Sequence, residues 1–171
     1  MKTWGVMVAL ALIAAWAQAL LPPVSLVGHA KWPLLWIVVL YYGLRRDVWR
    51  TSVAALVAGL LQDGMGYTPL GFSFLVFLLF GLCAAGIRAV LLTDGPMTAV
   101  ASGMILTLAM VLTSGVVLRA GGHVSLASSV LFAKGLGSAL LAGIAIVPVF
   151  SCATQADSLA GNARMKDDLH D

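Results

Sequence analysis

Few side chains in this sequence could carry chemistry, and one acid stands beside the central apolar part of the chain. Asp63 follows an apolar run and is followed closely by two glycines, Gly64 and Gly66. An ionisable group at membrane depth is by default a candidate functional group. An acid at a helix end in a glycine turn can also serve locally, by accepting hydrogen bonds from backbone N–H groups. We favour the local role for Asp63 and keep contact with a ligand or partner as the alternative.

Lys134 is a basic residue that could form a charge pair with Asp63. It lies just inside the last apolar run, where a lysine usually extends its amino group toward the membrane interface. Pairing of Lys134 with Asp63 is a second hypothesis, which reversal of both charges would test.

No arrangement of residues indicates an enzyme or a metal site. No serine is placed with a histidine and an acid, no carboxylates are paired inside an apolar run, and no phosphate-binding loop occurs. Cys83 and Cys152 should lie at different depths, so we expect no disulfide between them. We therefore predict no catalytic residue, no metal and no cofactor.

The composition is typical of a membrane protein. Of the 171 residues, 61% are hydrophobic and 10% are charged, and the mean hydropathy is +1.01. An ordinary soluble domain is about 45–50% apolar and about 25% charged. The net charge of +3 is spread along the chain, without the basic block that a nucleic-acid partner would require. We predict an all-α integral membrane protein that is embedded in the lipid bilayer.

Six apolar runs predict six transmembrane helices in one domain, residues 1–150, followed by a polar cytoplasmic tail, residues 151–171. The runs cover residues 4–21, 33–44, 51–62, 70–92, 97–118 and 126–150. The second and third runs are each about 12 residues, or roughly 18 Å as helix, against a hydrocarbon core of roughly 30 Å. We expect flanking residues to extend both helices. A pair that is packed inside the protein, as a re-entrant hairpin, is the alternative.

The first run, residues 4–21, has one competing interpretation. Lys2, the apolar stretch and Ala17-Gln18-Ala19 also fit a cleavable signal peptide. Trp4 and Trp16 inside the run favour a retained helix.

The basic residues predict the orientation. With six spans and a cytoplasmic N-terminus, seven of the ten lysines and arginines lie inside, as the positive-inside rule requires. Both termini are then cytoplasmic, and the turn after Asp63 faces the periplasm or the cell exterior.

Small residues repeat every four positions on three of the predicted helices. This spacing places them on one helix face and allows another helix to approach closely. They are Ala11, Ala15 and Ala19; Gly81, Ala85 and Ala89; and Gly135, Ala139 and Gly143. We expect most of them to serve packing within the protein, since six helices must pack first, and the rest to contact a partner.

The turn within residues 59–73 has the clearest local pattern. Gly64 and Gly66 are expected to reverse the chain, because glycine tolerates positive φ. Thr68 is expected to cap the following helix, and Pro69 to lie in its first turn, where a missing N–H costs nothing.

Three segments between residues 22 and 90 carry a family resemblance. They are Lys31-Trp32-Pro33-Leu34-Leu35 with Tyr41-Tyr42, then Gly59-Leu60-Leu61-Gln62-Asp63, then Gly66-Tyr67-Thr68-Pro69-Leu70-Gly71. In these segments the chain resembles MreD, the rod shape-determining membrane protein of bacteria. Gln62 departs from the family pattern, which usually has an apolar residue there, and Phe80-Gly81 stands where the family tends to have a tyrosine.

The resemblance implies a non-enzymatic protein of the bacterial inner membrane that supports cell-wall synthesis and cell shape. The implied partner is MreC, a bitopic membrane protein, and through it MreB filaments. The wider elongation machinery includes RodA, a glycan polymerase, and a class B penicillin-binding protein. The signature turn would comprise Gly59, Asp63, Gly64, Gly66, Pro69, Leu70 and Gly71.

The family is also similar in fold to the substrate-binding membrane subunits of energy-coupling-factor transporters, so the implied fold is a bundle like these S-components. This kinship supplies the rival function, a vitamin-binding transporter subunit. Such a subunit needs a cavity near the outer face with several convergent polar side chains. The predicted outer loops offer Asp63, Tyr67, His123 and Ser125, and so few polar groups favour the scaffold.

Overall fold

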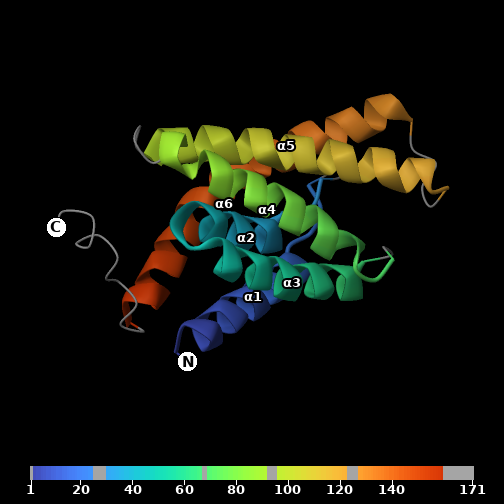
Figure 1. Ribbon diagram of the computed structural model, residues 1–171. Helices are drawn as coiled ribbons and strands as arrows, with labels where there is room; N and C mark the ends of the chain where they lie inside the picture. Colours follow the sequence, from blue (N-terminus) through green and yellow to red (C-terminus); the bar gives the residue numbers. More distant parts are fainter. Residues whose placement is uncertain (1, 25–29, 67–68, 92–95, 123–126, 160–171) are drawn as a thin grey trace.

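The structure is a computed structural model that describes residues 2–24, 30–66, 69–91, 96–122 and 127–159 (Figure 1). Every regular element in these ranges is an α-helix. The helices are α1 (Lys2–Leu20), α2 (Leu34–Arg45), α3 (Val48–Met65), α4 (Phe72–Leu91), α5 (Pro96–Ala120) and α6 (Ser128–Leu159). The all-helical prediction is therefore confirmed for the described residues.

Helix α2 lies at the centre of the bundle and contacts each of the other five helices (Figure 1). Every residue of α2 except Arg45 is buried, and Trp36 and Tyr42 are among the largest fully buried side chains of the described residues. The expected extension of the two short helices is right for α3, which has 18 residues. It is wrong for α2, which keeps 12 residues. A helix surrounded by protein on all sides does not need to match the thickness of the bilayer.

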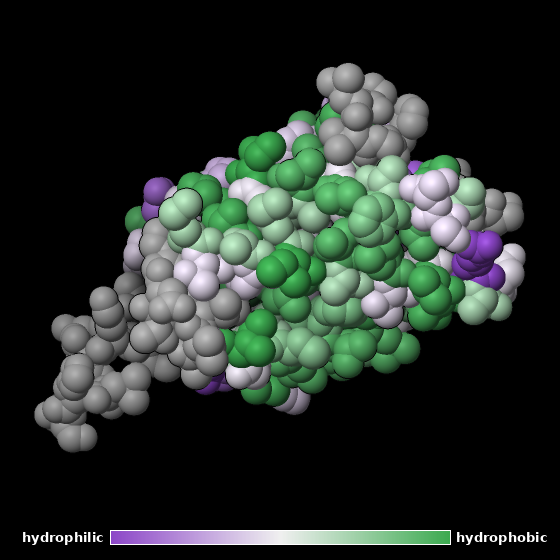
Figure 2. Space-filling model, turned by 90° about the horizontal axis from the view of Figure 1, so that it is seen from above, coloured by the Kyte–Doolittle hydropathy of each residue, from purple (hydrophilic) through white to green (hydrophobic). Residues whose placement is uncertain are grey.

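The described surface is strongly apolar. Figure 2 shows a face that is covered by hydrophobic side chains, with hydrophilic ones at its ends. Large exposed side chains occur on most of the helices, among them Trp16, Leu75, Ile105 and Ile144. Water would not tolerate so large a continuous apolar surface, whereas lipid chains would. Two helices, Met97–Ala120 and Ser128–Leu159, are long and apolar enough to cross a membrane, while the full set of six spans stays a prediction.

Helix α6 ends later than the sequence suggested. We expected the last helix to stop at residue 150, but α6 continues to Leu159. The additional turns are held by burial, because Ala153 and Asp157 are 0% and 2% exposed. Polar composition beyond residue 150 hid this contact, and residues 160–171 lie outside the described ranges.

Most of the small residues repeated every four positions pack inside the bundle. Ala11, Ala15, Gly81, Ala85, Gly135 and Ala139 are buried, Gly143 is half-buried and Ala19 is exposed. The side chain of Ala89 lies outside the description. A methyl group on Gly81 would lie 3.1 Å from side-chain atoms of both Thr51 and Val39. Small residues on α4 therefore permit its close approach to α2 and α3.

Candidate functional site

The turn between α3 and α4 is built differently from our expectation. Gly64 lies inside α3, and Gly66, just after it, has φ −114°, so neither adopts the positive φ that we predicted. The glycine of this turn that has positive φ is Gly71, at +90°. Helix α3 continues through Met65 because its backbone can stay helical across glycine. The chain therefore uses its positive-φ glycine at the end of the loop, just before α4, and not at the end of α3.

Pro69 also lies at a different position relative to α4 than we predicted. Helix α4 begins at Phe72, whose N–H donates to the carbonyl oxygen of Pro69 at 3.1 Å. Pro69 thus lies in a turn before the helix and not in its first turn. Leu70, in that turn, is 82% exposed, and Thr68 lies outside the described residues.

Asp63 caps α4 from the end of α3. Its Oδ2 accepts a hydrogen bond from the N–H of Gly71 at 2.7 Å, and its Oδ1 accepts one from the N–H of Ser73 at 3.1 Å. The first N–H groups of a helix have no partner within the helix and favour a negative charge. The Asp63 side chain, in a residue that is only 3% exposed, satisfies two of them. The local role that we favoured for this acid is therefore present.

Gly59 fixes the distance between the same two helices. A methyl group at this position would collide with the backbone of Phe74 in α4. Backbone atoms cannot move aside as a flexible side chain can, so a side chain at residue 59 would push α3 and α4 apart. Gly59 and Asp63, four residues apart on α3, together hold the start of α4.

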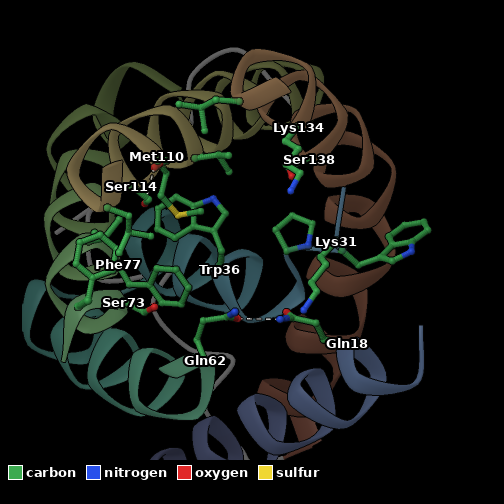
Figure 3. A pocket seen from close by; sticks show the side chains of 18 residues that line it. Gln18, Lys31, Trp36, Gln62, Ser73, Phe77, Met110, Ser114, Lys134 and Ser138 are labelled. Carbon is green, nitrogen blue, oxygen red and sulfur yellow. Dashed lines mark hydrogen bonds between the residues drawn. The ribbon is translucent and has the colours of Figure 1, made fainter. Parts of the chain in front are cut away.

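A cavity of about 280 Å³ lies behind this turn, at the end of the bundle where α1, α3 and α5 end and α2, α4 and α6 begin (Figure 3). Its apolar wall includes Trp36, Phe77 and Met110. Its polar lining residues are Gln18, Lys31, Gln62, Ser73, Ser114, Lys134 and Ser138. With the predicted orientation, this is the outer end of the protein.

Two glutamines bridge three helices beside the cavity. The Nε2 group of Gln18 donates to Oε1 of Gln62 at 2.8 Å, and Oε1 of Gln18 accepts a hydrogen bond from the N–H of Leu35 at 3.3 Å. Gln62 is the residue that departs from the family pattern, and this bond gives the departure a structural role. Two glutamines inside apolar runs are the sequence signal for this bond, and we did not predict the bond from them.

Trp36 is held in place inside the cavity wall. Its Nε1–H donates to Oγ1 of Thr107 at 3.0 Å, and the Thr107 hydroxyl donates to the carbonyl oxygen of Gly103 at 2.7 Å. The indole ring packs against Phe77 and Phe80, with ring centroids 5.7 and 6.4 Å away. The indole, which is 1% exposed, is therefore held rigidly in the wall by its hydrogen bond and its ring contacts.

Of the polar residues that the sequence offered for a ligand site, Asp63 is the one that the structure describes, and it is not among the cavity-lining residues. Asp63 points its carboxylate at the backbone of α4, while Tyr67, His123 and Ser125 lie outside the described residues. Lys134 lines the cavity, and the described residues show no ion pair between it and Asp63. Among the described residues, no three of His, Cys, Asp and Glu come close enough to hold a metal ion, and Cys83 and Cys152 are free.

A buried charge cluster that we did not predict from the sequence lies at the opposite end of the bundle. Asp157 of α6 pairs with Arg46, which follows α2, and also accepts a hydrogen bond from the Tyr41 hydroxyl at 3.0 Å. The carbonyl oxygen of Arg46 accepts a bond from Nη1 of Arg88 at 2.8 Å. Burial alone would lower the pKa of the Arg46 guanidinium, but the hydrogen bond and negative charge of Asp157 outweigh it and raise the pKa. The cluster joins α2, α4 and α6.

Comparison with known proteins identifies a family for the chain. The model of the family described as rod shape-determining protein MreD matches residues 1–153. No significant match was found among curated proteins or among solved structures. The family match spans all six helices up to the last turns of α6 and includes the turn at Asp63, so this chain belongs to the MreD family of bacterial rod shape-determining membrane proteins.

Proposed function

We propose that this protein is a non-enzymatic scaffold of the rod elongation complex, with six spans in the inner membrane and both termini in the cytoplasm. The observation that supports this most is the family match over residues 1–153, because that family is known for shape determination and not as an enzyme family. The proposed direct partner is an MreC-like bitopic protein. RodA and a class B penicillin-binding protein are proposed as further partners, and MreB filaments would be reached through the MreC-like protein.

The physical means of this function would be docking of a partner helix on the lipid-facing surface. Most of the regularly spaced small residues are buried by packing within the bundle, so a partner helix would have to contact other small residues. Gly5 on α1 and Gly86 on α4 are exposed, and a methyl group on either would meet no atom within 4 Å. Exposed small residues let a second helix approach closely within a membrane. We propose that one of these two helix faces receives the MreC-like helix.

Co-purification tests the scaffold and locates its contact face. The tagged protein should retain an MreC-like protein after extraction in mild detergent. Gly5→Leu and Gly86→Leu leave the fold room for a side chain, so each variant should keep the melting temperature of the wild type. One of them should lose most of the retained partner. Failure of the wild-type protein to retain any MreC-like protein would contradict the proposal.

The cavity favours a second candidate function, a substrate-binding subunit of an energy-coupling-factor vitamin transporter. A cavity of about 280 Å³ is close to the lower end of ligand pockets, which span roughly 300–1,000 Å³. Retention of a coupling ATPase during the same purification would favour the transporter, and retention of an MreC-like protein without an ATPase would favour the scaffold.

A further inference from the structure

We propose that the cavity behind the α3–α4 turn binds a small amphipathic anion, that is, a phosphate or carboxylate group attached to an apolar body. The inference rests on the juxtaposition of Lys31 and Lys134 with the aromatic wall around Trp36 in one cavity. It concerns a ligand site and does not depend on the scaffold function.

The charges of the lining residues point to an anion. Lys31, just before α2, and Lys134, in the second turn of α6, bring two ammonium groups to the same space. None of the described residues that line the cavity is acidic, and the ion pairs recorded among the described residues involve neither lysine. A cation that is partly withdrawn from water needs a compensating charge. Lys134 is half-buried, whereas Lys31 is exposed. A bound anion would therefore supply that charge to Lys134 and would also attract the ammonium group of Lys31.

The polar atoms beside the lysines fit the oxygens of such a group. Ser138 follows Lys134 by one helical turn and is only 7% exposed, yet no hydrogen bond from its hydroxyl is recorded among the described residues. The hydroxyl lies in the cavity wall, where it can donate to a ligand oxygen. The Gln18–Gln62 pair closes the cavity at another side and leaves amide groups at its surface. The positive charges of the two lysines and several hydrogen-bond donors therefore line the same cavity.

The opposite wall fits an apolar body. Figure 3 shows Lys31 and Lys134 on one side of the cavity, with Phe77, Trp36 and Met110 across from them. Phe72 and Val76 continue this wall along α4. Binding sites for small amphipathic molecules combine such an apolar lining with a few placed polar groups. A free inorganic anion would leave this wall without a contact, so the ligand should carry both parts.

Binding to the purified protein tests the site directly. We would remove lipid in a neutral detergent and titrate dihexanoyl phosphatidylglycerol, with dihexanoyl phosphatidylcholine as a probe of equal chain length and no net charge. Inorganic phosphate would be the probe without an apolar body. Isothermal titration calorimetry and the melting temperature would both report on occupancy. We expect binding of the phosphatidylglycerol at least tenfold tighter than that of either other probe.

Lysine variants and a matched control decide whether the cavity is the site. Lys134→Met and Lys31→Gln should each weaken phosphatidylglycerol binding about tenfold, whereas Lys134→Arg should keep it. Arg119→Gln removes an exposed cation from the same end of the bundle, outside the cavity lining, and should change nothing. Equal binding of the anionic and zwitterionic probes would overturn the proposal. So would equal loss in the Arg119 control.

Native mass spectrometry of the protein purified from membranes separates two sources of the ligand. A retained anionic phospholipid would identify the bilayer as the source, and a retained water-soluble anion would identify the space outside the cell. Either mass should be absent from the Lys134→Met variant and present in the Arg119→Gln variant. A mass that is retained equally by both variants would place the ligand elsewhere and overturn the proposal.

Discussion

Arg46 and Asp157 lie 111 positions apart in the sequence, and Nη2 of the guanidinium lies 2.7 Å from Oδ2 of the carboxylate. Their side chains are only 9% and 3% exposed. The pair joins the loop between α2 and α3 to the last turns of α6. It therefore closes one end of the bundle around the central helix.

Removing one member of this pair should destabilise the protein strongly. Asp157→Ala leaves the Arg46 charge buried without its carboxylate, and loss of one partner of a buried pair costs about 3–5 kcal/mol. Asp47→Ala is the matched control, because Asp47 is exposed and its Oδ2 forms an ion pair with Nε of Arg50 at 3.9 Å. Exposed pairs contribute about 0–1 kcal/mol. Thermal unfolding in detergent should show a large shift for the first variant and almost none for the second.

Two glycines of α3 should respond in opposite ways to the same substitution. Gly59→Ala forces α3 away from the backbone of Phe74, so we expect a large loss of melting temperature or of folded protein. Gly64→Ala meets no atom within 4 Å and replaces a helical glycine, which should stabilise the protein by about 0.4–1 kcal/mol. Equal effects of the two variants would contradict the close approach at Gly59.

Asp63 should be required for stability as a hydrogen-bond acceptor. Asp63→Ala leaves the N–H groups of Gly71 and Ser73 without this acceptor, and a lost helix cap costs about 0.5–2 kcal/mol. Asp63→Asn keeps one acceptor oxygen and should cost less. The order of melting temperatures, wild type above Asn above Ala, checks this role. An Asn variant as unstable as Ala would indicate that the negative charge itself matters more than the cap.

The two glycines that flank the loop should also differ. Gly71 has φ +90°, where a Cβ atom costs about 1–2 kcal/mol. Gly66 has φ −114°, a value that other residues adopt freely. Gly71→Ala should therefore lower the melting temperature by several degrees, while Gly66→Ala should leave it nearly unchanged. The reverse result would restore the turn that the sequence had suggested.

The proposed orientation predicts which exposed residues can be labelled from outside the cell. In a variant with both native cysteines replaced by serine, Gly121→Cys at the end of α5 should react with a membrane-impermeant maleimide in intact cells. Asp47→Cys, between α2 and α3, should react only after the cells are opened. Both positions are exposed in the structure, so burial would not explain a difference. Labelling of Asp47→Cys in intact cells would contradict the orientation.

Much of this fold follows from local sequence signals. The apolar runs gave the number and order of the helices because each run is bounded by charged, glycine or proline residues. The local role of Asp63 as an acceptor of backbone hydrogen bonds followed from an acid at a helix end beside glycines, although the helix cap itself was expected from Thr68. These features depend on neighbours in the sequence, and the sequence displays such neighbours directly.

The features that the sequence did not reveal depend on contacts between distant residues. The sequence could not show that α2 is central, that Asp157 reaches Arg46, or that Gln18 meets Gln62. Each of these polar residues looked like an ordinary solvent-exposed or interfacial side chain. The cavity was missed for the same reason, since its lining comes from all six helices and the segment before α2.

The complete enclosure of α2 bears on how the protein is assembled in the cell. An apolar segment of 12 residues is roughly 18 Å long as a helix and cannot by itself bridge a bilayer of roughly 30 Å. The hydrogen-bond partners of Tyr41 and Trp36 lie on α6 and α5, the last two helices to be synthesised. We therefore expect α2 to reach its final depth only after the C-terminal helices have left the translocon. The central helix would then be the last part of the bundle to take its final position.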